Sequence, residues 1–218
     1  RYGFHGLSYE SVVASLARHA PHLADKRLAI AHLGNGASLC AVHRGQSVAS
    51  TMGFTALDGL MMGTRSGSLD PGVLLWLIDE KGMDARALEA LLYQQSGLLG
   101  VSGLSSDMRV LRASEAQGSR EAIALFTYRI IREIGSLAAA LGGLDALIFT
   151  AGIGENDAAT RAEVVAGLGW LGLAIDPAAN QAGHARISPE GAAGEVWIIP
   201  TDEEGMIAAQ LWRLLQSA

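Results

Sequence analysis

The sequence predicts an α/β domain, because strand-like runs and helix-like segments share one chain of 218 residues. Five short runs are strand candidates, at residues 28–33, 37–42, 47–52, 145–151 and 197–200, and the first is an apolar run bounded like a buried strand. Elsewhere apolar residues recur at helical spacing, most clearly over 119–141, where Gly142 and Gly143 end the helix. A chain of this length can bury a substantial core.

The first three runs are joined by tight turns and predict a β-meander over 28–52. The turn between the first two is Gly34-Asn35-Gly36, whose glycines leave room for a ligand. Backbone N–H groups in such a turn can cradle a phosphate, and Asn35 and Ser38 offer further hydrogen bonds beside it. The alternative is that this segment is only a hairpin turn.

Capping residues predict where helices begin and end. The expected starts are Ser8, Asp70, Asp84 and Asp157, and the expected ends are Pro21 and Gly82. The helix after Asp70-Pro71 is apolar almost all round over 73–78, which predicts that it is buried. At the start of the last helix, Thr201 and Glu204 have capping-box spacing, which leaves Glu203 as the freer carboxylate.

Three irregular segments carry the polar residues that could bind a ligand. Residues 53–70 are punctuated by glycine, lack periodicity and contain one cation, Arg65; long loops of this kind are usually functional. A second loop over 100–108 leads into Asp107 and Arg109. After the strand at 145–151, a glycine turn over 152–156 precedes a helix, as at many nucleotide sites, but without dinucleotide or P-loop spacing.

Composition excludes several classes of function. Hydrophobic residues make up 50% and charged residues 17% of the chain, which excludes a disordered protein. The net charge of -6, without a basic cluster, argues against a nucleic-acid partner. The helical stretch 123–141 carries three charged side chains, so we expect no membrane span. Cys40 is the single cysteine, which fits a cytoplasmic location. Because the chain begins at Arg1 within a motif-like segment, it is expected to be part of something longer.

These features together indicate phosphoryl transfer. That chemistry needs backbone amides on phosphates, cations on the transferring group and a carboxylate that helps to hold Mg²⁺. The chain offers two glycine turns after strands, the isolated Arg65, His5 between Gly3 and Gly6, and the acidic pair Glu203-Glu204.

Five ordered motifs make the whole chain resemble the acetate kinase (acetokinase) family, in its C-terminal, nucleotide-binding half. The motifs are Arg1-Tyr2-Gly3-Phe4-His5-Gly6, His32-Leu33-Gly34-Asn35-Gly36, residues 59–71 around Met62-Gly63-Thr64-Arg65-Ser66-Gly67, residues 149–156, and Ile199-Pro200-Thr201-Asp202-Glu203-Glu204. The resemblance implies an RNase H-like core of the actin, Hsp70 and sugar-kinase type, with a mixed sheet flanked by helices. Residues 1–205 would form the ATP-binding domain, and the terminal helix 206–218 would pack on the remainder of the enzyme.

The resemblance also implies a reaction and the residues that carry it. The reaction is reversible transfer of the ATP γ-phosphoryl group to acetate, with Mg²⁺, giving acetyl phosphate and ADP. His5 and Arg65 are the expected catalytic residues, and Glu203 is the expected Mg²⁺ ligand, through water. The expected nucleotide-binding residues are His32, Gly34, Asn35, Gly36, Asp107, Arg109, Gly152, Ile153, Gly154, Glu155 and Asn156. Taken one by one, His5 could simply be packed in a loop, Arg65 could form a surface ion pair, and Asp107 could cap a helix.

The chain departs from the family pattern in two ways. The family motif usually reads His-Gly-Thr-Ser-His, whereas Leu7 and Tyr9 stand here at the threonine and second-histidine positions, which leaves the hydrogen bonds that support His5 open. The family's N-terminal half is not part of the sequence, so this chain alone is expected to bind nucleotide weakly and to turn over little. The alternatives are a propionate or butyrate kinase, a non-catalytic nucleotide-binding or dimerisation module, and a chaperone-type ATPase. A homodimer is expected through the apolar helices over 71–95 and 119–141.

Overall fold

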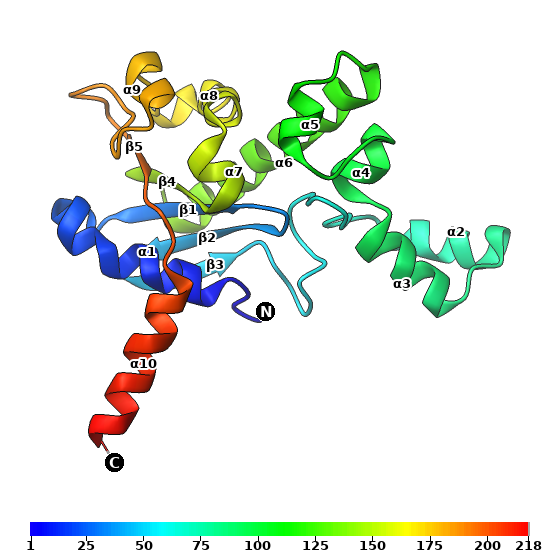
Figure 1. Ribbon diagram of the computed structural model, residues 1–218, viewed down its shortest axis with the longest axis horizontal. Coiled ribbons are helices and arrows are strands. Elements are labelled where there is room, and N and C mark those ends of the chain that lie inside the picture. The colour runs from blue at the N-terminus through cyan, green and yellow to red at the C-terminus, as the bar shows by residue number, and fades with distance from the viewer. Residues whose placement is uncertain (218) are drawn as a thin grey trace.

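The computed structural model describes residues 1–217 and contains a five-stranded mixed sheet in the order β3-β2-β1-β4-β5 (Figure 1). The strands are β1 (Arg27–Leu33), β2 (Ala37–His43), β3 (Gln46–Ser50), β4 (Ala146–Thr150) and β5 (Glu195–Ile198). The first three pair antiparallel, and β4 and β5 continue the sheet parallel to β1. The predicted meander and both later strands are therefore confirmed.

Each face of the sheet is covered by helices because both faces are apolar. On β1, Ala29, Ala31 and Leu33 belong to a core shared with α6 (Gln117–Leu141) and α8 (Ala158–Ala166). Their neighbours Leu28 and Ile30 belong to a second core, which contains Tyr9, Val12 and Leu16 of α1 (Gly6–His19). Alternate side chains of one strand thus enter the two opposite cores, as pleating requires.

The remaining helices lie between and after the strands along the chain. They are α2 (Pro71–Lys81), α3 (Ala85–Gln94), α4 (Gly97–Ser102), α5 (Met108–Arg112), α7 (Ala151–Asn156), α9 (Pro177–Ala182) and α10 (Glu203–Ser217), with 3₁₀ turns at Pro21–Leu23 and Gly169–Leu171. The side chains of Asp70, Asp84 and Asp157 cap α2, α3 and α8 as predicted, and Gly82 and Gly142 end α2 and α6 in left-handed conformations.

Three predicted boundaries were wrong. Ser8 does not cap α1: the helix begins at Gly6, and Ser8 is buried within it. The glycine segment after β4 is the short helix α7 and not a turn. The predicted loop 100–108 starts inside α4, which extends to Ser102.

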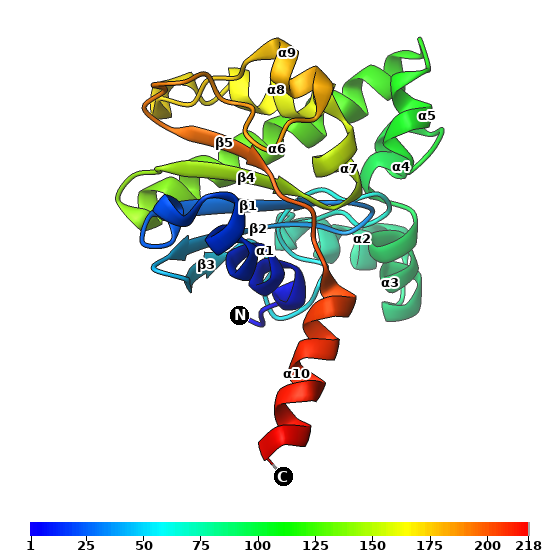
Figure 2. The same ribbon diagram turned by 60° about the vertical axis from the view of Figure 1, so that its left-hand side comes forward.

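The helix α2 is not buried, contrary to the prediction from its composition. Leu75 is 63% and Trp76 50% exposed, and none of its residues is buried. Figure 1 shows that α2 and α3 extend away from the sheet. Most apolar side chains of α2 are therefore exposed, while Leu74 and Leu77 are half-buried. The helix α10 also projects away from the sheet in both views (Figures 1 and 2).

No helix among residues 1–217 is long and apolar enough to cross a membrane.

Candidate active site

Two glycine segments that are far apart in the sequence meet at one edge of the sheet. The β1–β2 turn and α7 follow parallel neighbouring strands, β1 and β4, whose carboxyl ends lie side by side. A Cβ added to Gly34 would lie 3.8 Å from the Cβ of Ala151, which opens α7. Both segments line one cavity of about 700 Å³, which Gly34, Asn35, Ser106, Asp107, Met108, Arg109, Arg112, Gly152, Ile153, Asn156 and Asp157 surround.

Seven of the eleven residues predicted to bind nucleotide line this cavity, and four do not. His32 and Gly36 lie on the side of the β1–β2 turn that faces His5. Gly154 is a buried residue of α7 itself. Glu155 turns toward the protein, where its carboxylate accepts hydrogen bonds from the N–H groups of Ala151 (2.7 Å) and Thr201 (3.2 Å). Glu155 therefore ties α7 to the segment after β5.

The helix α7 is held from behind by a buried arginine that the sequence analysis did not single out. Arg161 is 2% exposed and donates to the carbonyl oxygens of Gly154 (3.0 Å) and Glu155 (2.8 Å), at the end of α7. It also donates to the side-chain oxygen (2.7 Å) and carbonyl oxygen (3.0 Å) of Asn180. The cation thus meets the partial negative charge of a helix C-terminus instead of a carboxylate.

His5 and Arg65 converge on Gly36. A Cβ added to Gly36 would lie 3.2 Å from Nε2 of His5 and 3.3 Å from Nη2 of Arg65. The other terminal nitrogen of Arg65 donates to the carbonyl oxygen of Ala56 (2.8 Å), which fixes the guanidinium. Arg65 makes no ion pair within residues 1–217, so the alternative that it is only half of a surface salt bridge is not supported.

The imidazole of His5 is constrained on several sides. Its backbone is in the left-handed region (φ 58°), which is uncommon for a residue with a Cβ. Its ring stacks on that of His32 at 4.0 Å between centroids, and its Nδ1 lies 2.8 Å from Oγ of Ser38. The hydroxyl of Tyr9 bonds the same Ser38 oxygen. The departure from the family motif at Tyr9 therefore still supplies a hydrogen-bond network to His5.

Burial keeps both stacked histidines neutral. Burial, followed by the nearby positive charge of Arg65, lowers the pKa of His5 from its usual 6.5. Burial and, secondly, His5 lower the pKa of His32 to about 3, and Nδ1 of His32 lies 2.8 Å from the Ser8 hydroxyl. His5 therefore faces the site as an uncharged imidazole at neutral pH, beside a permanently charged guanidinium.

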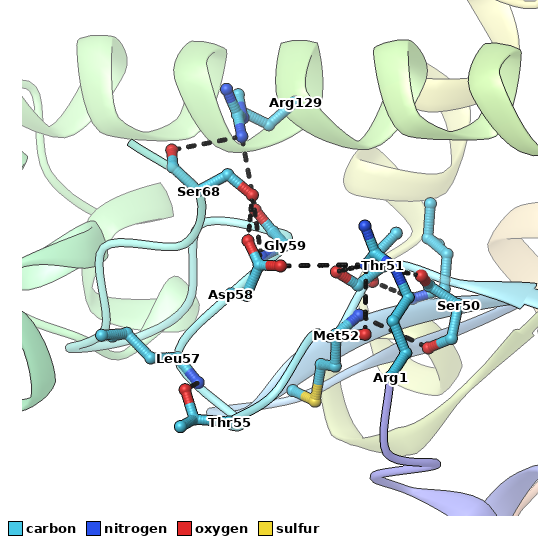
Figure 3. Close-up of polar contacts among 11 residues, drawn as sticks. Arg1, Ser50, Thr51, Met52, Thr55, Leu57, Asp58, Gly59, Ser68 and Arg129 are labelled. Atoms are coloured by element: carbon cyan, nitrogen blue, oxygen red, sulfur yellow. Dashed lines mark hydrogen bonds and ion pairs between the residues drawn. The ribbon is translucent and has the colours of Figure 1, made fainter. Parts of the chain in front are cut away.

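The loop that carries Arg65 is fixed by polar contacts at its base (Figure 3). Asp58 accepts hydrogen bonds from the Gly59 N–H (2.8 Å) and the Ser68 hydroxyl (2.5 Å). Arg129 of α6 donates to the carbonyl oxygens of both Gly59 (3.3 Å) and Ser68 (3.4 Å). Arg1 lies 3.8 Å from Asp58 and donates to three carbonyl oxygens at the end of β3. A loop without helix or strand is therefore still ordered.

Close backbone approach joins this loop to the β1–β2 turn. The N–H of Gly63 donates to the carbonyl oxygen of Asn35 (2.9 Å). A Cβ at Gly63 would lie 2.0 Å from Oδ1 of Asn35, so a larger residue there would displace the Asn35 side chain from its place in the turn. The predicted phosphate turn and the predicted arginine loop are thus directly connected.

Asp107 does cap a helix, as the alternative reading proposed, and it also lines the cavity. Its carboxylate accepts from the Arg109 backbone N–H (2.9 Å) at the start of α5 and pairs with the Arg109 guanidinium (2.6 Å). These hydrogen bonds, the side-chain one first, lower the pKa of Asp107 to about 2. Arg112, one turn further along, also reaches the cavity and pairs with Asp157 and Glu163. The i, i+3 spacing from Arg109 could have indicated Arg112.

The predicted capping box at the start of α10 is wrong, although Glu203 remains available. Asp202 caps the helix, since its carboxylate accepts from the Gly205 N–H (2.8 Å), and the hydroxyl of Thr201 is buried without a partner within residues 1–217. Asp202 is fixed at the capping position because its backbone N–H donates to the Ser11 hydroxyl of α1 (2.8 Å). Glu203 is half-buried and has no ion pair among the described residues.

Comparison with known proteins agrees with the resemblance seen in the sequence. The model of the acetokinase family matches residues 1–209. The acetate kinase of Rhodopseudomonas palustris (strain TIE-1) is 58% identical over 217 residues, which cover 98% of this chain and 54% of that protein. The acetate kinase of Methylocella silvestris is 55% identical over 215 residues, which cover 99% of this chain and 53% of that protein. The chain thus spans about half the length of the curated relatives it matches.

Solved structures give the same result for the fold. The crystal structure of Porphyromonas gingivalis acetate kinase has a TM-score of 0.91 and 39% identity, covering 99% of this chain and 56% of that one. A propionate kinase from Francisella tularensis subsp. tularensis SCHU S4 has a TM-score of 0.89 and 37% identity, covering 95% and 54%. The predicted fold class, an RNase H-like core of the actin, Hsp70 and sugar-kinase type, is confirmed.

Proposed function

The chain belongs to the acetokinase family, and we propose that it is the nucleotide-binding part of an enzyme that transfers the ATP γ-phosphoryl group reversibly to acetate. One observation carries the proposal: the cavity lined by Gly34 and Gly152 adjoins the point at Gly36 where His5 and Arg65 converge. A nucleotide with its base and ribose near Asp107 and Arg109 could therefore extend its phosphates over the β1–β2 turn toward these two side chains.

Each residue has a role that its geometry supports. The turn Gly34-Asn35-Gly36 would bind the β- and γ-phosphates through the backbone N–H groups of Asn35 and Gly36, because the Gly34 N–H already donates to the Gly36 carbonyl oxygen (3.0 Å). Arg65 would bond the oxygens of the transferring group, and the neutral His5 would donate a hydrogen bond to them. Both groups are held in place before the substrate arrives, so charge that develops in transfer is stabilised with little rearrangement.

Glu203 would supply the protein carboxylate for Mg²⁺. No cluster of three or more histidine, cysteine, aspartate or glutamate side chains that could hold a metal exists among the described residues. A single carboxylate fits Mg²⁺, which keeps several waters and is usually bound through one or two carboxylates and the substrate phosphates. The ion would neutralise charge on the phosphates during transfer.

The proposal is tested by exchanging this chain for the matching part of a complete relative. Residues 1–218 replace the corresponding segment of the Rhodopseudomonas palustris acetate kinase, and acyl phosphate formation is measured with acetate, propionate and butyrate. We expect ATP-dependent activity in this chimaera and little or none in the 218-residue chain alone. An inactive, folded chimaera would contradict the proposal.

The carboxylate series also distinguishes the nearest alternative. One of the similar solved structures is a propionate kinase, so a longer acceptor is the second candidate. A higher kcat/KM with propionate or butyrate than with acetate would favour that alternative. If the chimaera bound ATP but phosphorylated none of the three acids, a non-catalytic nucleotide-binding module would be favoured.

A homodimer and a cytoplasmic location complete the proposal. Support for the dimer comes from the exposed apolar side chains of α2, which include Leu75 and Trp76. The cytoplasmic location rests on the single cysteine, Cys40, which is buried and unpaired with another cysteine.

A further inference from the structure

Hydrogen bonds link Tyr9, Ser38 and His5 on the side of the imidazole that faces away from the site. Tyr9 of α1 bonds the Ser38 hydroxyl of β2, and that hydroxyl lies 2.8 Å from Nδ1 of His5. Ser38 is fully buried, and Tyr9 is 7% exposed. The other nitrogen, Nε2, is the one beside Gly36 and Arg65. The direction of the hydrogen bond between Ser38 and Nδ1 therefore decides whether Nε2 presents an N–H group or a lone pair to the site.

Only one arrangement of protons satisfies all three groups. Ser38 is the one partner of the Tyr9 hydroxyl within residues 1–217, so the Tyr9 proton must be donated to Ser38. Ser38 then donates its own proton to Nδ1 of His5, and the imidazole proton lies on Nε2. In the reverse arrangement Nδ1–H donates to Ser38 and Ser38 donates to Tyr9, which leaves a buried phenol proton without an acceptor, at a cost of about 1–3 kcal/mol.

We propose that Tyr9 is a positioning residue for His5: acting through Ser38, it holds the imidazole in the tautomer whose Nε2–H points toward Gly36 and Arg65. The inference deepens the proposed function, because an Nε2–H donor is the form that can bond an anionic phosphoryl oxygen. The opposite tautomer would present a lone pair to that oxygen and repel it.

Other contacts leave the imidazole little freedom to escape this arrangement. Stacking on His32 at 4.0 Å fixes the plane of the ring, and the left-handed backbone conformation of His5 fixes the direction in which its side chain leaves the main chain. Burial raises the pKa of Tyr9, so its hydroxyl keeps the proton that it must donate. Burial also lowers the pKa of His5, so its ring carries a single proton at neutral pH. The position of that proton then matters, whereas a doubly protonated ring would have no tautomers.

The direct test is the proton position on His5 in the full 218-residue chain. Histidine labelled with ¹⁵N in the ring reports which nitrogen carries the proton, and Nε2 and Nδ1 give separate signals. The signals of His5 are assigned among the six histidines with the variant His5→Gln. We expect His5 to be entirely Nε2–H at pH 7. A proton on Nδ1, or an equal mixture of tautomers, would overturn the proposal without any mutation of Tyr9.

The variant Tyr9→Phe tests the part played by the phenol. Without it nothing donates to the Ser38 oxygen and polarises its hydroxyl, so the Ser38–Nδ1 hydrogen bond weakens and the Nδ1–H tautomer should become detectable in the His5 signals. The matched control is Tyr128→Phe, the same change at a tyrosine of α6 that is 56% exposed, and the His5 signals should stay unchanged. Unchanged His5 signals in a folded Tyr9→Phe variant would overturn the role of Tyr9.

Kinetics in the chimaera provide the second readout. Tyr9→Phe should lower kcat roughly 2- to 10-fold, the worth of one hydrogen bond, with the KM for ATP nearly unchanged. A rise in KM for ATP with an unchanged kcat would overturn the positioning role. If the chimaera without substitutions were inactive, the proposed function would fail, while the tautomer measurement would still decide the inference about Tyr9.

Discussion

At the scale of single residues, His5 and Arg65 reach the same glycine from separate parts of the chain. Arg65 comes from an irregular loop, and its guanidinium is held by one carbonyl oxygen, which leaves Nη2 beside Gly36. His5 comes from the position before α1, where stacking and a buried serine hold it. Both side chains are thus held beside Gly36 by the protein itself, and this preorganisation underlies the prediction for Arg65.

Removing the Arg65 charge should nearly abolish phosphoryl transfer. In the chimaera, Arg65→Gln should lower kcat by about 10³-fold, since a cation on the transferring group stabilises its developing charge. Arg86→Gln is the control, because Arg86 is an exposed residue of α3 that pairs only with Glu89 in the described chain. A loss below tenfold in Arg65→Gln, with the control unaffected, would remove Arg65 from the catalytic residues.

Burial of His32 should make the fold less stable as the pH falls. Its pKa is lowered from 6.5 in the unfolded chain to about 3 in the folded one, so the unfolded state binds a proton that the folded state excludes. The stabilisation is complete above pH 6.5 and is lost progressively as the pH falls toward 3. Urea unfolding should show a contribution of about 1 kcal/mol between pH 6 and pH 5 that is missing in His32→Gln. Equal slopes in the two proteins would contradict it.

At the scale of elements, the position of α7 depends on contacts with α8 and with the segment after β5. Its first residue, Ala151, has a positive φ (66°), and its last carbonyls bond Arg161 of α8. Glu155 holds its first N–H and the segment after β5 at the same time. The cavity wall formed by α7 is therefore set by neighbours, since six residues are too few for a stable isolated helix.

Replacing Arg161 by lysine should destabilise the protein although the charge is kept. An ammonium group cannot reach the oxygens of Gly154, Glu155 and Asn180 together, whereas the planar guanidinium can. We expect a loss of about 2–3 kcal/mol in the free energy of unfolding and weaker ATP binding. The exposed Arg18→Lys is the control for chemical denaturation, and a loss no larger than in this control would argue against the role of Arg161.

The exposed apolar face of α2 leads to a prediction about assembly. Leu75 and Trp76 are 63% and 50% exposed, and such side chains at a subunit interface lose this exposure. Trp76→Glu should shift the protein from dimer to monomer in sedimentation velocity, because a buried carboxylate without a partner is costly. A protein without the substitution that sediments as a monomer would refute the proposed dimer at once.

At the scale of the whole molecule, the sequence predicts what is local and misses what depends on neighbours. Strands were predicted within two residues at their ends. The buried strands β1, β2 and β4 are mainly apolar runs, and the tight turn after β2 indicated the exposed β3. The wrong prediction for α2 has a simple cause: composition shows that a helix is apolar but not whether anything covers it. Thr201 and Asp202 are both N-cap residue types, and the choice of Asp202 is supported by Ser11, 191 positions away in the sequence.

The candidate site divides in the same way. Residues that line the cavity carry a local signal, since glycine turns after strands are recognisable in any α/β chain. The roles of Arg161 and Ser38 have no such signal, because a buried arginine or serine is identified only by the groups that surround it. Gly63 is predictable in part. A glycine in an irregular loop is expected from the sequence, but the close approach of Asn35 is seen only in the structure.

The terminal helix provides a prediction about the complete protein. Leu211 and Leu215 lie one turn apart on α10 and are 57% and 66% exposed, so replacing both with glutamine should cost the 218-residue chain little. If α10 packs on the remainder of the enzyme, the same double variant should destabilise the chimaera by about 3 kcal/mol or more, because fully burying a leucine contributes about 1.5–3 kcal/mol. Chemical denaturation of both proteins measures this difference. Equal losses in the chain and in the chimaera would mean that α10 stays in solvent, and the apolar face of the helix would then need another partner.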